Sequence, residues 1–311
     1  MSRKILQYIT KRRYFQGQTT QKSLIIKRLT HYAEHIIAGT KGGVGKSFAS
    51  AMLAGAAEDL GLSLSVYDTD NENRTLATLM KEHCRFLDEQ KETYPLDEVI
   101  NSLYESSPVT VTIVDMKAGT SRSTQEWFSS VPWDALRKID VDVYVAGCVT
   151  SDPDSVRTFG PWLEYFHNID FPVHYLLIKN AKDGDNFFVC DSLLEPGMRE
   201  MELDYSVFFI SPIEQEYIGK LNNNDILLRD YLHGKGPKTL LPTIMQKSRL
   251  RNHYYAITDQ FIEFFASRME ANERNESRQK ILTSVQKRIA LRSGVQPDEH
   301  EKEETTKSKG N

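Results

Sequence analysis

The chain is poor in cysteine and has no long apolar run. Its three cysteines, Cys84, Cys148 and Cys190, are widely spaced and form no pair of the kind that holds a metal. No apolar stretch approaches the roughly 18 residues that a transmembrane helix needs, and no apolar segment follows the basic N-terminus as it does in a signal peptide. These absences argue against disulfide-stapled and membrane-spanning proteins, and they predict a cytoplasmic protein with free thiols.

Neither sign of charge is in large excess. The 311 residues include 39 Lys and Arg against 43 Asp and Glu, which gives a net charge of −4. This balance argues against bulk electrostatic binding to nucleic acid, although a local basic patch is compatible with it. Hydrophobic residues make up 40% of the chain, enough to bury the core of one large α/β domain or two small ones.

One glycine-rich stretch lies between two apolar segments. Residues 39–47 read Gly-Thr-Lys-Gly-Gly-Val-Gly-Lys-Ser, follow the apolar run 35–38 and precede a predicted helix over 47–60. Such glycines let successive backbone N–H groups converge on phosphate oxygens, and the helix N-terminus adds partial positive charge. We expect Lys46 to reach the β- and γ-phosphates and the Ser47 hydroxyl to hold Mg²⁺. The residues predicted to contact a nucleoside triphosphate here are Gly42, Gly43, Val44, Gly45, Lys46, Ser47 and Phe48.

A second lysine lies inside this stretch. Residues 41–47, Lys-Gly-Gly-Val-Gly-Lys-Ser, resemble the deviant Walker A motif of the ParA/MinD family of P-loop ATPases. The resemblance implies ATP and Mg²⁺ as cofactors and a homodimer that closes around two ATP molecules. It also implies catalytic roles for Lys46 and Lys41, with Lys41 reaching the phosphates of the partner's nucleotide. The alternative is that Lys41 only steers an anionic ligand by its charge.

From residue 34 onward, apolar runs alternate with helix-like segments. This alternation predicts an α/β fold with a mostly parallel, doubly wound sheet and helices on both faces, as in P-loop NTPases. We expect the binding site beyond the carboxyl ends of the strands. The predicted strands are 36–38, 62–67, 109–114, 141–146, 173–178 and 207–210, and the predicted helices are 47–60, 73–87, 96–105, 155–166, much of 187–202, and 254–269.

Two aspartates follow the second predicted strand. The sequence Asp68-Thr69-Asp70 resembles the family's Asp-x-Asp, which implies that Asp70 orients the attacking water and that Asp68 supports the Mg²⁺ shell. A carboxylate can orient water with one hydrogen bond, and a loose transition state demands little general-base strength. Asp70 also suits the N-cap of the following helix, a role that is compatible with catalysis. The proline and glutamine usual after this pair in the family are absent from residues 71–74.

The third predicted strand ends in Asp115, which resembles a Walker B carboxylate for Mg²⁺. The residues after it, Met116-Lys117-Ala118-Gly119, resemble the family's Asp-x-Pro-Ala-Gly switch with lysine in place of proline. The resemblance implies that Gly119 supplies an N–H to the γ-phosphate, while the loop loses the fixed φ of proline. Lys117 is either a new contact to phosphate or to a partner, or simply solvated.

Two later stretches are predicted to hold the base. Lys179-Asn180 ends a predicted strand and is similar to the position where the family places an asparagine against adenine. An asparagine side chain offers the adenine edge both a donor and an acceptor. Ile210-Ser211-Pro212 resembles the later loop that covers the base, so we include Pro212 in the nucleotide site.

The two ends differ in charge from the middle, and we divide the chain into a basic extension over 1–33, an ATPase domain over 34–270, and a charged helix with an acidic tail over 271–311. The extension is an arm for DNA, lipid or a protein partner, a solvated tail, or the product of a misplaced start codon. Basic residues within 247–251 form either a nonspecific DNA surface or a solvated face. The narrow apolar stripe over 281–289, followed by acidic residues, favours partner binding or self-association over membrane binding.

The sequence therefore favours a slow, dimerising ATPase that positions or segregates cargo such as plasmid DNA or a conjugation apparatus, with a protein partner that activates it. The missing cysteine pairs argue against metal-cluster carriers, and the absence of tyrosine from the tail argues against bacterial tyrosine kinases of similar motif. The alternative is a nucleotide-gated protein-binding module in which hydrolysis is incidental and the tails carry the output. A small-molecule ligase that uses the same loop is a third reading.

Overall fold

The computed structural model falls into two units, residues 1–261 and 262–311. In the second unit only residues 262–268 are described, and there the Arg268 guanidinium lies 5.6 Å from the centre of the Phe264 ring. The fold below is that of the first unit. Across the chain the structure describes residues 23–28, 33–38, 42–70, 74–88, 94–103, 111–117, 121–138, 141–241 and 243–268.

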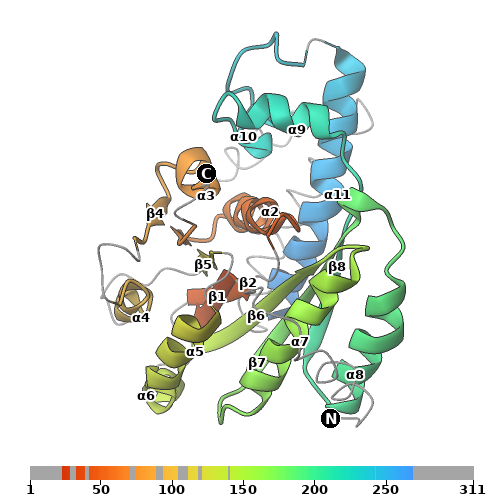
Figure 1. Cartoon of the computed structure of the whole chain (residues 1–311). Coiled ribbons are helices and arrows are strands. Elements are labelled where there is room, and N and C mark those ends of the chain that lie inside the picture. The colour runs from red at the N-terminus through yellow and green to blue at the C-terminus, as the bar shows by residue number, and fades with distance from the viewer. Residues whose placement is uncertain are drawn as a thin grey trace, which may run out of the picture. The chain divides into compact units, whose positions relative to one another are not determined.

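The described strands form one eight-stranded sheet in the order β4-β3-β5-β1-β2-β6-β7-β8 (Figure 1). Every pairing is parallel except those of β1, which runs antiparallel to β2, β5 and β6. The predicted, mostly parallel α/β sheet is thus confirmed. The strands are β1 (Ser23–Arg28), β2 (Ala33–Ala38), β3 (Leu64–Asp68), β4 (Cys84–Phe86), β5 (Val111–Asp115), β6 (Val141–Val149), β7 (Val173–Asn180) and β8 (Tyr205–Ile210).

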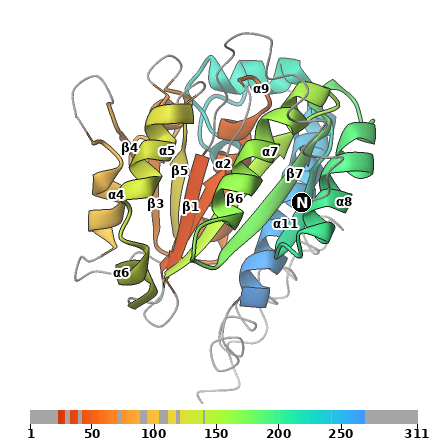
Figure 2. The ribbon, with the colours of Figure 1, turned by 60° about the horizontal axis from the view of Figure 1, so that its bottom comes forward.

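Helices cover both faces of this sheet, with α5 and α7 in front of it and α2 behind it in Figure 2. On the α7 face the core is aromatic: the Phe128 ring lies 5.0 Å from Phe166 and 6.2 Å from Trp162, centre to centre. The described helices are α2 (Lys46–Asp59), α3 (Thr75–Leu79), α4 (Asp97–Ser102), α5 (Ser121–Ser130), α6 (Trp133–Lys138), α7 (Pro153–His167), the 3₁₀ turn η1 (Ala181–Asp183), the π-helical turn η2 (Cys190–Leu194), α8 (Glu195–Glu200), α9 (Gln215–Asn222), α10 (Leu228–Leu232) and α11 (Ile244–Arg268).

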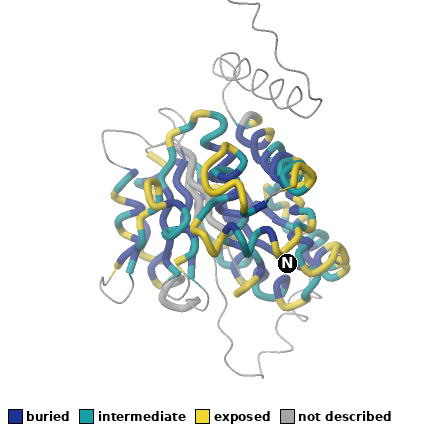
Figure 3. Tube along the Cα trace, turned by 90° about the horizontal axis from the view of Figure 1, so that it is seen from above, coloured by how far each residue is buried: buried dark blue, intermediate teal, exposed yellow. Residues whose placement is uncertain are grey.

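Most residues of the helix α2 are buried. Figure 3 colours the buried residues of the chain dark blue and the exposed ones yellow. The small residues of α2 let neighbouring elements approach closely. At Gly55, for example, an added Cβ would lie 2.7 Å from the Tyr254 hydroxyl oxygen of α11. Arg229 on α10 is bonded to Asp59 at the end of α2, with 2.9 Å between Nε and Oδ1. The helix that carries the glycine-rich loop is therefore fixed at its far end as well.

Three predicted segments differ from the structure. The helix predicted over 73–87 ends at Leu79, and the chain then turns and forms β4 beside β3. The apolar pattern that supports a helix stops at Met80, and the next three residues are polar and exposed, so a longer helix would gain no burial there. Within the predicted extension, residues 23–28 form β1, whose Leu-Ile-Ile run suits a strand. The last helix begins at Ile244, ten residues before the predicted start.

The edge strand β8 is capped by a side chain. Gln260 of α11 accepts a hydrogen bond from the Phe209 N–H through Oε1 and donates one to the Phe209 carbonyl through Nε2, both at 2.9 Å. The amide group of Gln260 thus occupies the place that a ninth strand would take at this residue.

Candidate functional site

A cleft of about 620 Å³ lies beyond the carboxyl ends of β3, β7 and β8. It is lined by the glycine-rich loop together with Asp70 and Thr75. Residues of η1 and of the segment after β8 line it as well, among them Ile210, Ser211 and Ile213. This is the edge of a parallel sheet at which ligands bind in α/β folds.

The loop has the backbone that a phosphate cradle needs. Gly43 and Gly45 have φ of 72° and 92°, in the left-handed region that favours glycine. Gly45 is the N-cap of α2, so Lys46 and Ser47 begin the helix, and its first turn, whose N–H groups have no partner within the helix, lies at the cleft. Gly42, Phe48 and Ser47 also line the cleft, as their predicted role requires.

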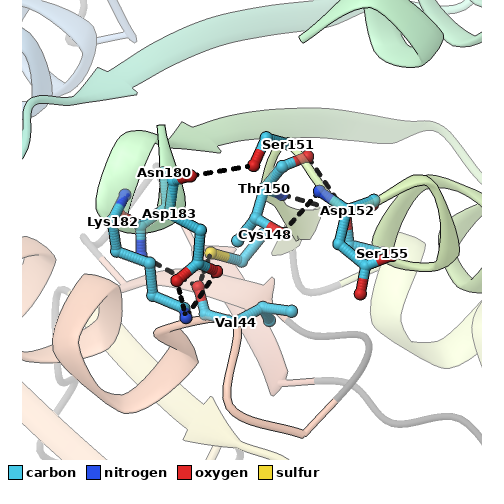
Figure 4. A network of polar contacts seen from close by, with 9 residues as sticks. All are labelled: Val44, Cys148, Thr150, Ser151, Asp152, Ser155, Asn180, Lys182 and Asp183. Atoms are coloured by element: carbon cyan, nitrogen blue, oxygen red, sulfur yellow. Dashed lines mark hydrogen bonds and ion pairs between the residues drawn. The ribbon is translucent and has the colours of Figure 1, made fainter. Parts of the chain in front are cut away.

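The loop is held from below by two strands (Figure 4). The Val44 carbonyl accepts hydrogen bonds from Asn180 Nδ2 at the end of β7, at 2.9 Å, and from Cys148 Sγ on β6, at 3.1 Å. A Cβ on Gly45 would lie 2.2 Å from Asn180 Nδ2, so this position has no room for any larger residue. The loop is therefore shaped by the sheet beneath it.

Lys46 is the cation of the loop. Only 8% of it is exposed, and burial lowers its pKa, while the charges of Asp115, Cys148 and Asp70 act in the opposite direction. A buried ammonium among carboxylates is a site for an anion that brings its own cation, because the anion takes up the lysine charge and the cation takes up the carboxylates.

Asp68 and Asp70 occupy different places. Asp68 is fully buried, and its carboxylate accepts hydrogen bonds from the N–H of Asp70, at 2.9 Å, and of Ala77 in α3, at 3.0 Å. Burial, reinforced by the nearby charge of Asp115, raises the pKa of Asp68 to about 6. Asp70 lines the cleft. Asp68 thus shapes the segment that presents Asp70 to the cleft.

Residues 35–294 match the CobQ/CobB/MinD/ParA nucleotide binding domain family, CbiA. The chain belongs to this family. It therefore carries a nucleotide-binding domain of the ParA/MinD type, as the glycine-rich loop and the strand-end aspartates predicted. Among curated proteins no match is found. None of the helices in the described part of the chain is long and apolar enough to cross a membrane.

The donor set of this family member fits a magnesium nucleoside triphosphate. The cleft offers backbone N–H groups, the Lys46 ammonium, the Ser47 hydroxyl and the Asp70 carboxylate at one end. Asp115, at the end of β5, is 2% exposed and close enough for its charge to oppose the lowering of the Lys46 pKa by burial. Oxygen ligands of this kind are those that Mg²⁺ prefers.

Other predicted site residues are less directly placed. The Asn180 amide is engaged on both sides, since Nδ2 donates to Val44 and Oδ1 accepts from the Lys182 N–H at 3.2 Å, so its predicted contact with adenine stays a prediction. Pro212 is exposed, between Ser211 and Ile213, which do line the cleft. Lys41 and Gly119 lie outside the described residues.

Sequence reasoning missed Thr69, the residue between the two aspartates. Its hydroxyl accepts a hydrogen bond from the Lys117 N–H at 2.7 Å and donates one to the Asp115 carbonyl at 3.2 Å. Its own N–H donates to the same carbonyl at 2.9 Å. Thr69 therefore ties the end of β3 to the segment after β5. The one feature of the sequence that could have indicated this role is a hydroxyl residue between two carboxylates that were predicted to be functional.

Proposed function

We propose that this chain is a slow, Mg²⁺-dependent ATPase that dimerises on ATP and positions or segregates cargo such as plasmid DNA or a conjugation apparatus. The observation that carries the proposal is one cleft that is lined both by Lys46 and Ser47, at the start of α2, and by Asp70. A phosphate cradle, a lysine for the phosphates and a carboxylate for water are the parts that phosphoryl transfer to water uses.

Each residue has a separate role in this proposal. ATP with Mg²⁺ supplies the γ-phosphoryl group and the charge neutralisation that its transfer needs. Lys46 donates hydrogen bonds to the β- and γ-phosphates, while the Ser47 hydroxyl and the carboxylates of Asp115 and Asp68 hold or support the metal. Asp70 accepts a hydrogen bond from the attacking water and orients it, and Gly119 donates its N–H to the γ-phosphate.

The dimer is the second part of the proposal and rests on Lys41. In this reading Lys41 crosses the interface to the partner's phosphates, so ATP is needed to hold two copies together. Slow turnover is expected because the charge of the transition state is fully offset only when a protein partner acts on the dimer. We place this dimer in the cytoplasm.

The test is ATP turnover by purified protein at several concentrations, with and without nonspecific duplex DNA. Turnover that rises more than linearly with protein concentration supports a dimeric ATPase. Wild-type turnover no higher than that of a Lys46→Ala control would refute the proposal that the protein hydrolyses ATP. Lys41→Ala should abolish ATP-dependent dimerisation in light scattering. Asp70→Ala should bind ATP and accumulate as dimer, and normal turnover by that variant would remove Asp70 from the reaction.

The comparison of turnover with and without DNA tests the basic residues at the start of α11. Two of them already have neighbours: Lys247 Nζ lies 5.9 Å from the centre of the Tyr231 ring, and Arg249 lies 3.4 Å from a carboxylate oxygen of Glu214. Stimulation by DNA that weakens with salt would assign them to phosphate contacts. DNA-indifferent turnover would direct the search to a protein partner of the extension over 1–33 or the tail over 271–311.

A further inference from the structure

We propose that the basic N-terminal segment of this chain, residues 1–22, docks on an exposed apolar patch at the edge strand β8 of the same molecule. This β8 patch consists of Val207 and Phe209 of β8 and of Phe188, two residues before η2. Residues 1–22 lie outside the described residues, and their composition, charge and length identify them as the occupant. The proposal goes beyond the proposed function and does not depend on a bound nucleotide.

Two apolar side chains of β8 remain accessible on one face of the strand. Phe208 is buried, whereas Val207 on one side of it is 44% exposed and Phe209 on the other side is 40% exposed. Residues two apart on a strand lie on the same face, so Val207 and Phe209 form one surface. The Phe209 ring lies 6.1 Å from the Phe187 ring, centre to centre, and the next residue, Phe188, is 71% exposed. Neighbouring large apolar side chains that stay accessible mark an interaction surface.

The occupant of this patch binds through side chains. Both backbone groups of Phe209 are bonded to the Gln260 side chain, so an added strand finds no free backbone partner at this residue. The Phe209 ring, in contrast, is left accessible. The β8 patch therefore suits a segment that presents apolar side chains, rather than one that extends the sheet.

The part of the chain that forms the patch is acidic. Residues 179–209 carry seven acidic side chains against three basic ones, a net charge of −4. Two of the acids are close to Phe209, because its partner in the sheet, Lys179, forms ion pairs with Asp191, at 2.7 Å, and with Glu195. The Asp191 side chain is still 57% exposed, so a second cation can reach it. The seven acids are Asp183, Asp185, Asp191, Glu195, Glu200, Glu202 and Asp204.

The N-terminal segment complements this surface in both charge and apolar content. Residues 1–22 carry six basic side chains and no acidic one, a net charge of +6. Opposite charges steer such a segment toward the acidic surface, and apolar contact holds it there. Its large apolar side chains are Ile5, Leu6, Tyr8, Ile9, Tyr14 and Phe15.

The segment is long enough to reach the patch of its own chain. Ser23, where β1 begins, pairs with Ala38 at the carboxyl end of β2, and Phe209 lies one residue before the carboxyl end of β8. The sheet order places four strand spacings between β1 and β8, about 19 Å at about 4.8 Å each. Residues 10–22 span about 40 Å when extended. A tether of this length gives an effective concentration of about millimolar, so a weak contact is sufficient.

The test is cross-linking of the full-length protein with a carbodiimide, which joins a carboxylate to a lysine amine without a spacer. Lys4 and Lys11 report on the N-terminal segment. The protein is an equal mixture of ¹⁵N-labelled and unlabelled copies, and the cross-linked peptides are identified by mass spectrometry. In the wild type, Lys4 and Lys11 should be joined to acids within 183–204, and both peptides of each cross-link should come from the same copy.

Two double variants test the apolar contact from its two sides. Val207→Thr with Phe209→Thr removes the patch but keeps residues that favour a strand. The yield of these cross-links should fall about fivefold or more, because loss of one such buried side chain changes an equilibrium constant roughly tenfold. Ile5→Ser with Ile9→Ser keeps every charge and both reporter lysines, and it should have the same effect. Tyr94→Thr is the matched control, because Tyr94 is 65% exposed and precedes α4, which is paired with β4 at the other edge of the sheet.

Three results would overturn the proposal. Cross-links that join labelled to unlabelled copies would assign the β8 patch to the N-terminal segment of a second copy. A lack of cross-links from Lys4 and Lys11 to acids within 183–204 would show that the segment does not occupy this surface and is free for DNA or lipid. Yields that either double variant leaves unchanged would reduce the contact to attraction between charges, without docking on the apolar patch.

Discussion

Gly45→Ala isolates the close contact between the phosphate loop and β7. Gly45 has φ of 92°, and a Cβ there would lie 2.2 Å from Asn180 Nδ2. The left-handed backbone alone costs an alanine about 1–2 kcal/mol. Relief of the overlap requires Asn180 to move, which breaks its bonds to Val44 and Lys182, each worth about 1 kcal/mol. We expect Gly45→Ala to lower the free energy of unfolding by about 3–4 kcal/mol.

Gly43→Ala is the matched control. Gly43 has φ of 72°, and a Cβ there would meet nothing within 4 Å, so its substitution should cost only the backbone strain of about 1–2 kcal/mol. Both variants are compared with wild type by equilibrium urea unfolding.

A double-mutant cycle with Asn180→Ala then separates overlap from strain. Once the Asn180 side chain is removed, Gly45→Ala should cost no more than Gly43→Ala does. Equal costs for Gly45→Ala in the presence and absence of the Asn180 side chain would refute this reasoning.

Three further predictions concern protonation and the strand ends. Because the pKa of Asp68 is raised from 3.8 to about 6 in the folded state, its contribution of about 3 kcal/mol to the free energy of unfolding is fully present only below pH 3.8. This contribution is lost as the pH rises through 6, and Asp68→Asn should flatten this part of the stability profile. His253 acts in the opposite direction, because burial lowers its pKa to about 4. A contribution of about 3 kcal/mol to the free energy of unfolding is therefore present above pH 6.5 and is lost as the pH falls through 4. Chemical unfolding of His253→Gln across this pH range should not show that loss of stability. Thr69→Val keeps the shape of the side chain but removes the hydrogen bonds of its hydroxyl to Lys117 and Asp115. Exchange of the Lys117 amide hydrogen should therefore become faster. Unchanged exchange would show that the Thr69 hydroxyl does not tie the two strand ends together.

The sequence was sufficient for most of the parallel strands and for the glycine-rich loop, but not for β1 and β4. Runs such as Val111–Asp115 are buried at every residue and mostly apolar because both faces of the sheet are covered, and such runs can be recognised without tertiary information. The loop at Gly45 and Lys46 could be recognised because its chemistry requires residues in consecutive order. The turn at Met80 was missed because a helical pattern does not reveal where burial ends.

The part of the cleft that follows β7 and β8 could not be derived in the same way. Asn180 was assigned to the base on the resemblance, but its amide holds Val44, a residue far away in the sequence. Lys182 and Asp183 look like an ordinary charged turn in the sequence, but in the structure they line the same cleft as Ile213. Contacts of this kind depend on which strand ends are neighbours, and single-sequence patterns carry little information about that.

The capped edge of β8 limits how copies of this protein can assemble. With both backbone groups of Phe209 bonded to Gln260, a second molecule cannot extend the sheet at that residue without first displacing α11. At the opposite edge, β4 has only three residues, and its Arg85 is paired with Glu98. Growth of open, strand-to-strand polymers is therefore disfavoured at both edges of the described sheet. The proposed dimer would therefore have to form through other surfaces than these two strand edges.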